Sequence, residues 1–299
     1  MTNRIFESFI KMLEELKIVI KRKVKRETPL WHALMFIKQL PFRYNPLLIL
    51  RRKNLIPWVP NKRSIEIEIT TRCSLACFNC DRSIRQAPSD DCMSLEQIEK
   101  FVDESIKLNW GWKHIRLTGG EPTLHPQFFE ILKIVKRYKE INFYCNVEIS
   151  TNGYGSQVNE VLSKLPQWIC VINSRKKSNI NNFCSYNIAP IDLKEYENSD
   201  FTKGCWITGI CGLGLTKYGY YPCGAGASVD RVFGFDIGQR SLSCVNNLTL
   251  REQLRVLCRY CGHYKENYAD EKITLEKMSI SWQKAYEIYK RKRPQLSVY

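Results

Sequence analysis

The sequence predicts an α/β fold, a partial (β/α) barrel whose strands and helices alternate along the chain. Two observations predict it. From Ser64 onward, short segments typical of strands alternate with longer segments of helical periodicity. Such alternation is typical of parallel βαβ units, which form an open or partly closed barrel. Polar or cysteine-rich motifs directly follow three of the predicted strands, where parallel sheets carry their functional groups.

Length and composition limit the class of protein. The 299 residues suffice for one large domain or for a core with a small appendage. No secretory signal is recognisable, and no apolar run approaches the ~20 residues of a membrane span. Thirteen cysteines without such a signal favour metal ligation over disulfides, because the cytosol keeps thiols reduced. We therefore expect a cytoplasmic protein.

Residues 1–63 carry most of the positive charge, +11 of the formal +16. Within them, residues 4–26 place apolar side chains at intervals of three and four and end on KRKVKR, which predicts an amphipathic helix. Residues 40–63 contain four prolines and predict a linker. We expect the helix to pack on the main domain with a solvated basic face. The alternative is peripheral association with an anionic membrane surface or an acidic partner.

The predicted elements then follow in order. Residues 64–70, SIEIEIT, alternate isoleucine with glutamate and predict a strand. In the helix that follows, Ser94 and Gln97 have the spacing of a capping box. The remaining predicted strands are 114–117, 146–150, 168–173 and 183–188, and the remaining predicted helices are 127–138, 156–164 and a closing amphipathic helix at 281–295.

The first motif places Cys73, Cys77 and Cys80 within eight residues after the first strand. A structural zinc ion takes four protein ligands and a disulfide takes two, so three thiols fit neither well. They indicate a metal centre with one position left open.

Two further motifs follow the next two strands. Gly119, Gly120 and Glu121 form GGEP after the second strand, and Ser150, Thr151 and Asn152 end the third. Because the carboxyl ends of parallel strands meet at one edge, we expect all three motifs on the same face. A plain βα turn and a routine Asn-Gly turn are the alternatives for the second and third motifs.

CxxxCxxC followed by GGEP resembles the radical S-adenosylmethionine (SAM) superfamily, over residues 64 to 261. The resemblance implies that Cys73, Cys77 and Cys80 hold a [4Fe–4S] cluster whose fourth iron binds SAM. One electron then breaks a carbon–sulfur bond and releases a 5′-deoxyadenosyl radical.

The resemblance also assigns roles to the other two motifs. It implies that the strand end at Gly119 and Gly120 approaches SAM, that Glu121 holds the loop or the SAM ammonium, and that Ser150, Thr151 and Asn152 contact the ribose. Two departures stand out. Asn79 replaces the usual aromatic residue before the third cysteine, and residues 174–204 are too few for full late barrel units, which we expect to be abbreviated.

A second group of cysteines follows residue 204 and resembles the SPASM/twitch extension of radical SAM enzymes. The short, twitch form implies one auxiliary [4Fe–4S] cluster with four ligands, Cys205, Cys223, Cys258 and Cys261. Cys211 competes with Cys205, and a zinc ribbon is the alternative for the whole element. The predicted organisation is an N-terminal extension (1–63), a radical SAM partial barrel (64–204), a twitch-like domain (205–265) and a helical tail (266–299).

The favoured function is a radical SAM enzyme that abstracts hydrogen from a small polar substrate. Sugar- or phosphate-bearing molecules are candidates for this substrate, and flavodoxin or ferredoxin for the reducing partner. A peptide-modifying maturase is the alternative within the superfamily. A zinc-dependent nucleic-acid-binding protein is the alternative of another class. We expect the remaining thiols to be small buried residues and His263 to be no ligand; these thiols are Cys92, Cys145, Cys170, Cys184 and Cys244.

Overall fold

The computed structural model describes residues 50–51, 55–179, 186–265 and 278–299. The predicted basic helix at 4–26 and Cys184 lie outside these residues. Residues 54–299 form one compact unit, which contains all of the elements below. Residues 55–63 enter this unit without a helix, and Trp58 is buried, its backbone N–H donating to the carbonyl of Lys203 at 2.8 Å.

A six-stranded sheet organises the unit, in the order β4-β3-β2-β1-β5-β6. Neighbouring strands from β4 to β5 run parallel, and β6 returns antiparallel to β5. The predicted α/β class with a parallel sheet is therefore confirmed. The strands are β1 (Ser64–Thr70), β2 (His114–Gly119), β3 (Asn146–Thr151), β4 (Cys170–Asn173), β5 (Leu213–Thr216) and β6 (Gly219–Tyr221).

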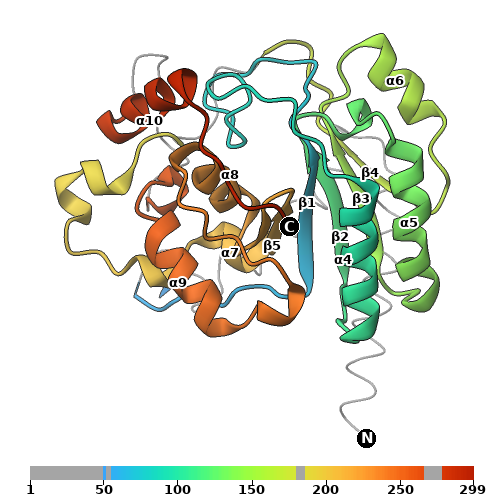
Figure 1. Cartoon of the computed structure of the whole chain (residues 1–299), viewed down its shortest axis with the longest axis horizontal. Helices are drawn as coiled ribbons and strands as arrows, with labels where there is room; N and C mark the ends of the chain where they lie inside the picture. Colours follow the sequence, from blue (N-terminus) through green and yellow to red (C-terminus); the bar gives the residue numbers. More distant parts are fainter. Residues whose placement is uncertain (1–49, 52–54, 180–185, 266–277) are drawn as a thin grey trace, which may run out of the picture. The chain divides into compact units, whose positions relative to one another are not determined.

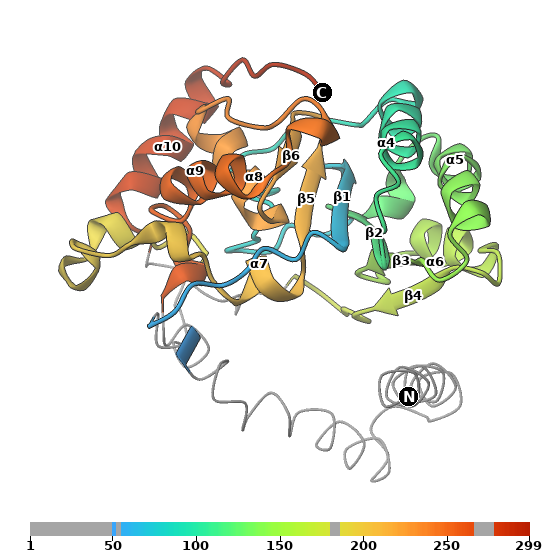
Figure 2. The same ribbon diagram turned by 90° about the horizontal axis from the view of Figure 1, so that it is seen from below.

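Helices occupy the connections between the parallel strands and most of the C-terminal third. Figures 1 and 2 show α4, α5 and α6 beside β1–β4, and α8, α9 and α10 on the β5–β6 side. The helices are α4 (Leu95–Lys107), α5 (Phe128–Ile141), α6 (Ser156–Ser163), α7 (Trp206–Ile210), α8 (Gly224–Phe233), α9 (Asn247–Leu257) and α10 (Ile280–Arg291). Short 3₁₀ turns are η1 (Pro122–Leu124), η2 (Pro190–Asp192), η3 (Lys194–Tyr196), η4 (Phe201–Lys203), η5 (Leu242–Cys244) and η6 (Gly262–Tyr264).

Local sequence explains the starts of these elements. The capping box predicted at Ser94 and Gln97 is present: the Ser94 hydroxyl accepts from the Gln97 backbone, and the Gln97 side chain accepts from the Ser94 backbone. Together they satisfy two of the amide groups that the first turn of α4 leaves unpaired. The predicted closing helix is also confirmed as α10.

The strand predicted at 183–188 is wrong over its described part, because residues 186–188 form a turn. β5 and β6 were not predicted. Leu213–Thr216 is a four-residue apolar run, too short for its periodicity to separate strand from helix. β5 pairs directly with β1, so residues on either side of the predicted boundary at 204/205 share one sheet.

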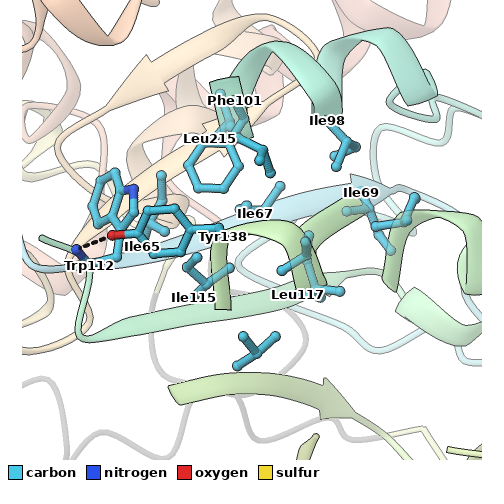
Figure 3. Packing of buried hydrophobic residues seen from close by; sticks show 14 of the residues in the cluster. Ile65, Ile67, Ile69, Ile98, Phe101, Trp112, Ile115, Leu117, Tyr138 and Leu215 are labelled. Carbon is cyan, nitrogen blue, oxygen red and sulfur yellow. Dashed lines mark hydrogen bonds between the residues drawn. The ribbon is translucent and has the colours of Figure 1, made fainter. Parts of the chain in front are cut away.

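The main core lies between the sheet and helices α4 and α5. Figure 3 shows Ile65, Ile67 and Ile69 on one face of β1, in the same core as Phe101 of α4 and Tyr138 of α5. The Tyr138 hydroxyl accepts a hydrogen bond from the Trp112 backbone N–H at 2.9 Å. Each fully buried side chain of this kind contributes about 1.5–3 kcal/mol. The alternation of β1 therefore turns Glu66 and Glu68 to the opposite face of the sheet.

A second core packs α8 and α10 together on the β6 side. It includes Tyr221, Val229, Trp282 and Tyr286, all buried. None of the described helices has the length and apolar content that crossing a bilayer requires.

Candidate functional site

The loop that follows β1 carries Cys73, Cys77 and Cys80. Cys77 is buried and the other two are partly exposed. The Cys73 sulfur accepts hydrogen bonds from the Leu75 backbone at 3.4 Å and from the Asn152 amide at 3.7 Å. Burial raises the pKa of Cys80 to about 12, so this thiol holds its proton unless a metal replaces it.

The glycines of the second motif lie directly against this loop. A Cβ atom on Gly119 would lie 2.1 Å from the Thr70 carbonyl oxygen, and one on Gly120 would lie 2.4 Å from that of Arg72. The backbone N–H groups of Gly120 and Glu121 donate to these same two carbonyls at 2.9 and 2.7 Å. Only residues without a side chain allow this approach, so the end of β2 is fixed to the cysteine loop.

Glu121 is completely buried and binds the third motif. Its carboxylate accepts from the Thr151 hydroxyl at 2.9 Å and from the Asn152 backbone at 2.7 Å. It also accepts from the Thr123 hydroxyl at 2.8 Å. Glu121 was expected to hold the loop or the SAM ammonium. These hydrogen bonds show it holding the loops together.

Asn152 continues these contacts back to the cysteine loop. Its amide nitrogen donates to the Ser74 hydroxyl at 3.1 Å, and its amide oxygen accepts from the Tyr154 backbone at 2.7 Å. The three motifs therefore meet at one edge of the sheet, as their positions after parallel strands predict. Ser150 lies one residue before this cluster, on β3 opposite Ile172 of β4.

A row of charged side chains lies further down the polar face of the sheet. The register places Glu66 opposite Arg116 and Arg116 opposite Glu148. Arg116 donates to Glu66 at 2.9 Å and to Glu148 at 3.0 Å. Burial acts to raise the pKa of Glu148, but the hydrogen bonds and charges of His114 and Arg116 lower it overall, so Glu148 is ionised.

The second cysteine group converges on one small cavity. Cys205, Cys223, Cys258 and Cys261 all line it, at the ends of helices α7, α8, α9 and the turn η6. Apolar side chains close the rest of the wall; they are Ile207, Pro222, Ala225, Leu254 and Leu257, with Tyr264. Burial is the main cause that raises the pKa of all four thiols.

Cys211 is half-buried at the end of α7 and is not among the residues that line this cavity. His263 is buried beside Tyr186 and is likewise not a lining residue. Cys145 is buried as expected, and Cys92 and Cys170 are partly exposed. The expectation of burial is wrong for Cys244, which is exposed on η5.

Comparison with known proteins identifies the domain that the first three motifs form. Residues 67–169 match the family model of the radical SAM superfamily. Residues 67–169 therefore form a domain that matches the radical SAM superfamily. This finding favours the radical SAM interpretation of the cysteine loop over the zinc-dependent nucleic-acid-binding alternative.

The curated relatives match over a short part of the chain. A probable GTP 3′,8-cyclase of Methanocaldococcus jannaschii is 37% identical over 86 residues, which is 28% of this chain and 28% of the relative. One of Pyrococcus horikoshii is 34% identical over 90 residues, 30% of this chain and 26% of the relative. The match thus spans between a quarter and a third of the length of these relatives.

Among solved structures, BtrN in complex with AdoMet and 2-DOIA aligns with 71% of this chain and 99% of its own, at 14% identity and a TM-score of 0.41. SuiB of Streptococcus suis bound to precursor peptide SuiA aligns with 56% of this chain and 37% of its own, at 17% identity and a TM-score of 0.30. Similarity at this level is weak and adds nothing to the assignment.

A [4Fe–4S] cluster and SAM are the cofactors of a radical SAM domain, and the residues of the first loop fit them. Three thiols are the donors that iron–sulfur clusters take. Asn79, beside Cys80, has a left-handed backbone at φ 54° and a buried amide without a hydrogen-bond partner among the described residues. No three described His, Cys, Asp or Glu side chains converge on a single ion. A four-iron cluster does not require such convergence, because each of its thiolate ligands binds a different iron.

Sequence reasoning missed several residues that build this site. Thr123 and Ser74 hold Glu121 and Asn152, and Arg82 forms an ion pair with Glu66 at 2.8 Å. Thr123 belongs to the GGEP loop and could have been noticed there. The strict alternation of glutamate in β1 was the available signal for the charged face, whereas nothing in the local sequence indicates the partners of Arg82.

Proposed function

We propose that this chain is a radical SAM enzyme of the twitch type, which cleaves SAM reductively and takes a hydrogen atom from a small polar substrate. The observation that carries the proposal is the Glu121 cluster. One buried carboxylate joins the GGEP loop to the end of β3, and that strand end contacts Cys73 through Asn152. The cysteine loop and the proposed SAM-binding loops thus form one hydrogen-bonded unit. Such a unit is required if the cluster and SAM are to bind next to each other.

In this proposal the chain's own residues bind and orient. Cys73, Cys77 and Cys80 would hold the cluster, which supplies the electron that cleaves SAM to a 5′-deoxyadenosyl radical. The half-buried backbone at Gly119 and Gly120 would receive the methionine part of SAM. Ser150, Thr151 and Asn152 would lie toward its ribose, with Glu121 fixing the position of the last two.

The second cavity supports an auxiliary [4Fe–4S] cluster with Cys205, Cys223, Cys258 and Cys261 as ligands. These residues come from segments up to 56 positions apart, yet all four line one apolar cavity. Four thiols around one cavity are a donor set that a four-iron cluster takes, and binding would release their protons. The absence of Cys211 from the cavity wall favours Cys205 as the fourth ligand.

The polar face of the sheet supports a small polar substrate. Glu66, Arg116 and Glu148 present fixed charges there, which suit hydrogen-bonding groups and disfavour an apolar ligand. A nucleotide, the substrate class that the name GTP 3′,8-cyclase indicates for the curated relatives, belongs to this class. All six strands of the described residues lie in the one sheet, which leaves no separate strand module for a peptide.

We further propose an external one-electron reductant, such as flavodoxin or ferredoxin, as the partner. Any contact of residues 1–63 with an anionic membrane surface stays a separate hypothesis, resting on charge alone.

Anoxic reconstitution with iron and sulfide tests the proposal. We expect about eight irons per chain, the content of two four-iron clusters, and 5′-deoxyadenosine when SAM and dithionite are added. Cys205→Ala should halve the iron, whereas Cys211→Ala, a matched loss of one thiol nearby, should leave it unchanged.

Each part of the proposal fails on a different result. Bound zinc in place of half of the iron would remove the auxiliary cluster. Equal iron loss in both variants would remove the ligand assignment. A full iron content without SAM cleavage would contradict the radical SAM activity itself.

A further inference from the structure

Arg82 lies between the two cysteine sites. It follows Cys80 by two positions and its side chain is almost completely buried, the residue being 8% exposed. Nη2 donates to Glu66 at 2.8 Å, and Nε lies 3.9 Å from a carboxylate oxygen of Glu68. The loop of the first cysteine site therefore places the Arg82 guanidinium on the polar face of the sheet, where it pairs with Glu66 and Glu68.

The same guanidinium packs against Gly224, which lies between the cavity-lining residues Cys223 and Ala225. A Cβ atom on Gly224 would lie 2.1 Å from Arg82 Nη1 and 2.7 Å from Nη2, so the guanidinium packs directly on this glycine. Gly224 is the first residue of α8, and Cys223 is the N-cap before it. Nη1 is buried and has no hydrogen-bond partner among the described residues.

The sheet explains why α8 can come so close. Gly214 of β5 is opposite Glu66 in the register, and a Cβ atom there would lie 2.7 Å from the backbone of Cys223. Two glycines thus leave room, Gly214 for the Cys223 backbone and Gly224 for the Arg82 guanidinium, which lies one residue from Cys223.

Two positive groups therefore meet at Cys223. The N-terminus of a helix carries a partial positive charge, and the Gly226 backbone N–H already points at the Cys223 sulfur, at 3.3 Å. Glu66 and Glu68 pair with Nη2 and Nε of the guanidinium, whereas Nη1 has no hydrogen-bond partner among the described residues. A cluster with four thiolate ligands would be a further anion near this helix end, and it becomes more negative by one charge on reduction.

We propose that Arg82 is a positioning and charge-setting residue of the auxiliary site, whose cation raises the reduction potential of the cluster bound through Cys223. The inference rests on the auxiliary cluster proposed above. The step concerned is the uptake of one electron from an external reductant, with no bond made or broken. Stabilising the added negative charge makes that uptake more favourable.

The test is a redox titration of the reconstituted full chain, followed by electron paramagnetic resonance. The auxiliary signal is the one that added SAM leaves unchanged. Arg82→Gln should shift its midpoint to a more negative potential, because the cation is lost. Glu66→Gln should shift it the opposite way, because the cation loses a neutralising partner. Arg240→Gln removes the same charge from the loop after α8 and should leave the midpoint unchanged.

Gly224→Ala provides a variant in which every charge is kept. Its methyl group would displace the guanidinium from Cys223, so the midpoint should again become more negative. This variant carries the test if the loss of Arg82 prevents folding.

The outcomes separate this inference from the function on which it depends. An auxiliary signal whose midpoint is the same in the wild type, in Gly224→Ala and in any folded Arg82→Gln protein would overturn the role of Arg82 and leave the cluster in place. A wild-type protein with only one cluster would overturn both.

Discussion

Glu121 illustrates how one buried carboxylate can hold the loops of a site together through hydrogen bonds. Its two oxygens accept from Thr123, Thr151 and Asn152, on loops that the chain separates by about 30 residues. No basic side chain pairs with it in these contacts. Hydroxyl and backbone donors satisfy its oxygens in these contacts.

Glu121→Gln should weaken SAM binding and destabilise the fold by about 1–3 kcal/mol, because the new amide hydrogens would face N–H or O–H donors. Chemical denaturation and SAM titration by calorimetry measure the two effects. Glu130→Gln, an exposed position on α5, is the control and should change neither. Unaltered SAM affinity in a folded Glu121→Gln protein would contradict the role given to this carboxylate.

The sequence identified the residues of the first site because cysteine spacing and GGEP are short, local patterns. It could not choose between two roles for Glu121, since the answer depends on Thr151 and Asn152 being within reach. The position of Arg82 could not be predicted from the sequence, because Gly224 lies 142 positions away and no local pattern encodes that contact.

β1 contributes to the core, to the polar face of the sheet and to the first cysteine site. Its isoleucines fill the core, its glutamates form the polar face, and its carboxyl end begins the cysteine loop. This strand and its two faces were predictable, because alternation over seven residues is a strong signal. β5 was not, because its four residues LGLT become a strand only through pairing with β1.

Gly120→Ala should separate the end of β2 from the cysteine loop, because its methyl group would lie 2.4 Å from the Arg72 carbonyl oxygen. We expect a lower melting temperature and loss of iron from the first site, measured by calorimetry and iron analysis. Gly111→Ala is the matched control, since a Cβ atom there meets nothing within 4 Å. Full iron in Gly120→Ala would show that the close approach is dispensable.

The iron-free protein should lose stability as the pH rises above about 9. An unfolded thiol ionises near its ordinary pKa of 9.0, whereas burial keeps Cys258 and Cys261 protonated well above it. Above pH ~9 the unfolded chain therefore binds fewer protons than the folded one, and the free energy of unfolding falls with pH.

Urea denaturation at about pH 8 and about pH 10 measures this slope. Replacing both Cys258 and Cys261 by alanine should reduce it, and buried tyrosines account for what is left. An equal slope in the variant would mean that these thiols are not protonated in the fold. The cluster-loaded protein should show less of the effect, because its thiols have already lost their protons.

The pairing of β5 with β1 also bears on how the molecule can be divided. A fragment ending before Leu213 would leave one side of β1 as a bare sheet edge, with backbone groups ready to join another chain. The segment that supplies the second set of cysteines thus also protects the strand that leads to the first. Truncation of the C-terminal part would then produce aggregates instead of a minimal SAM-binding domain.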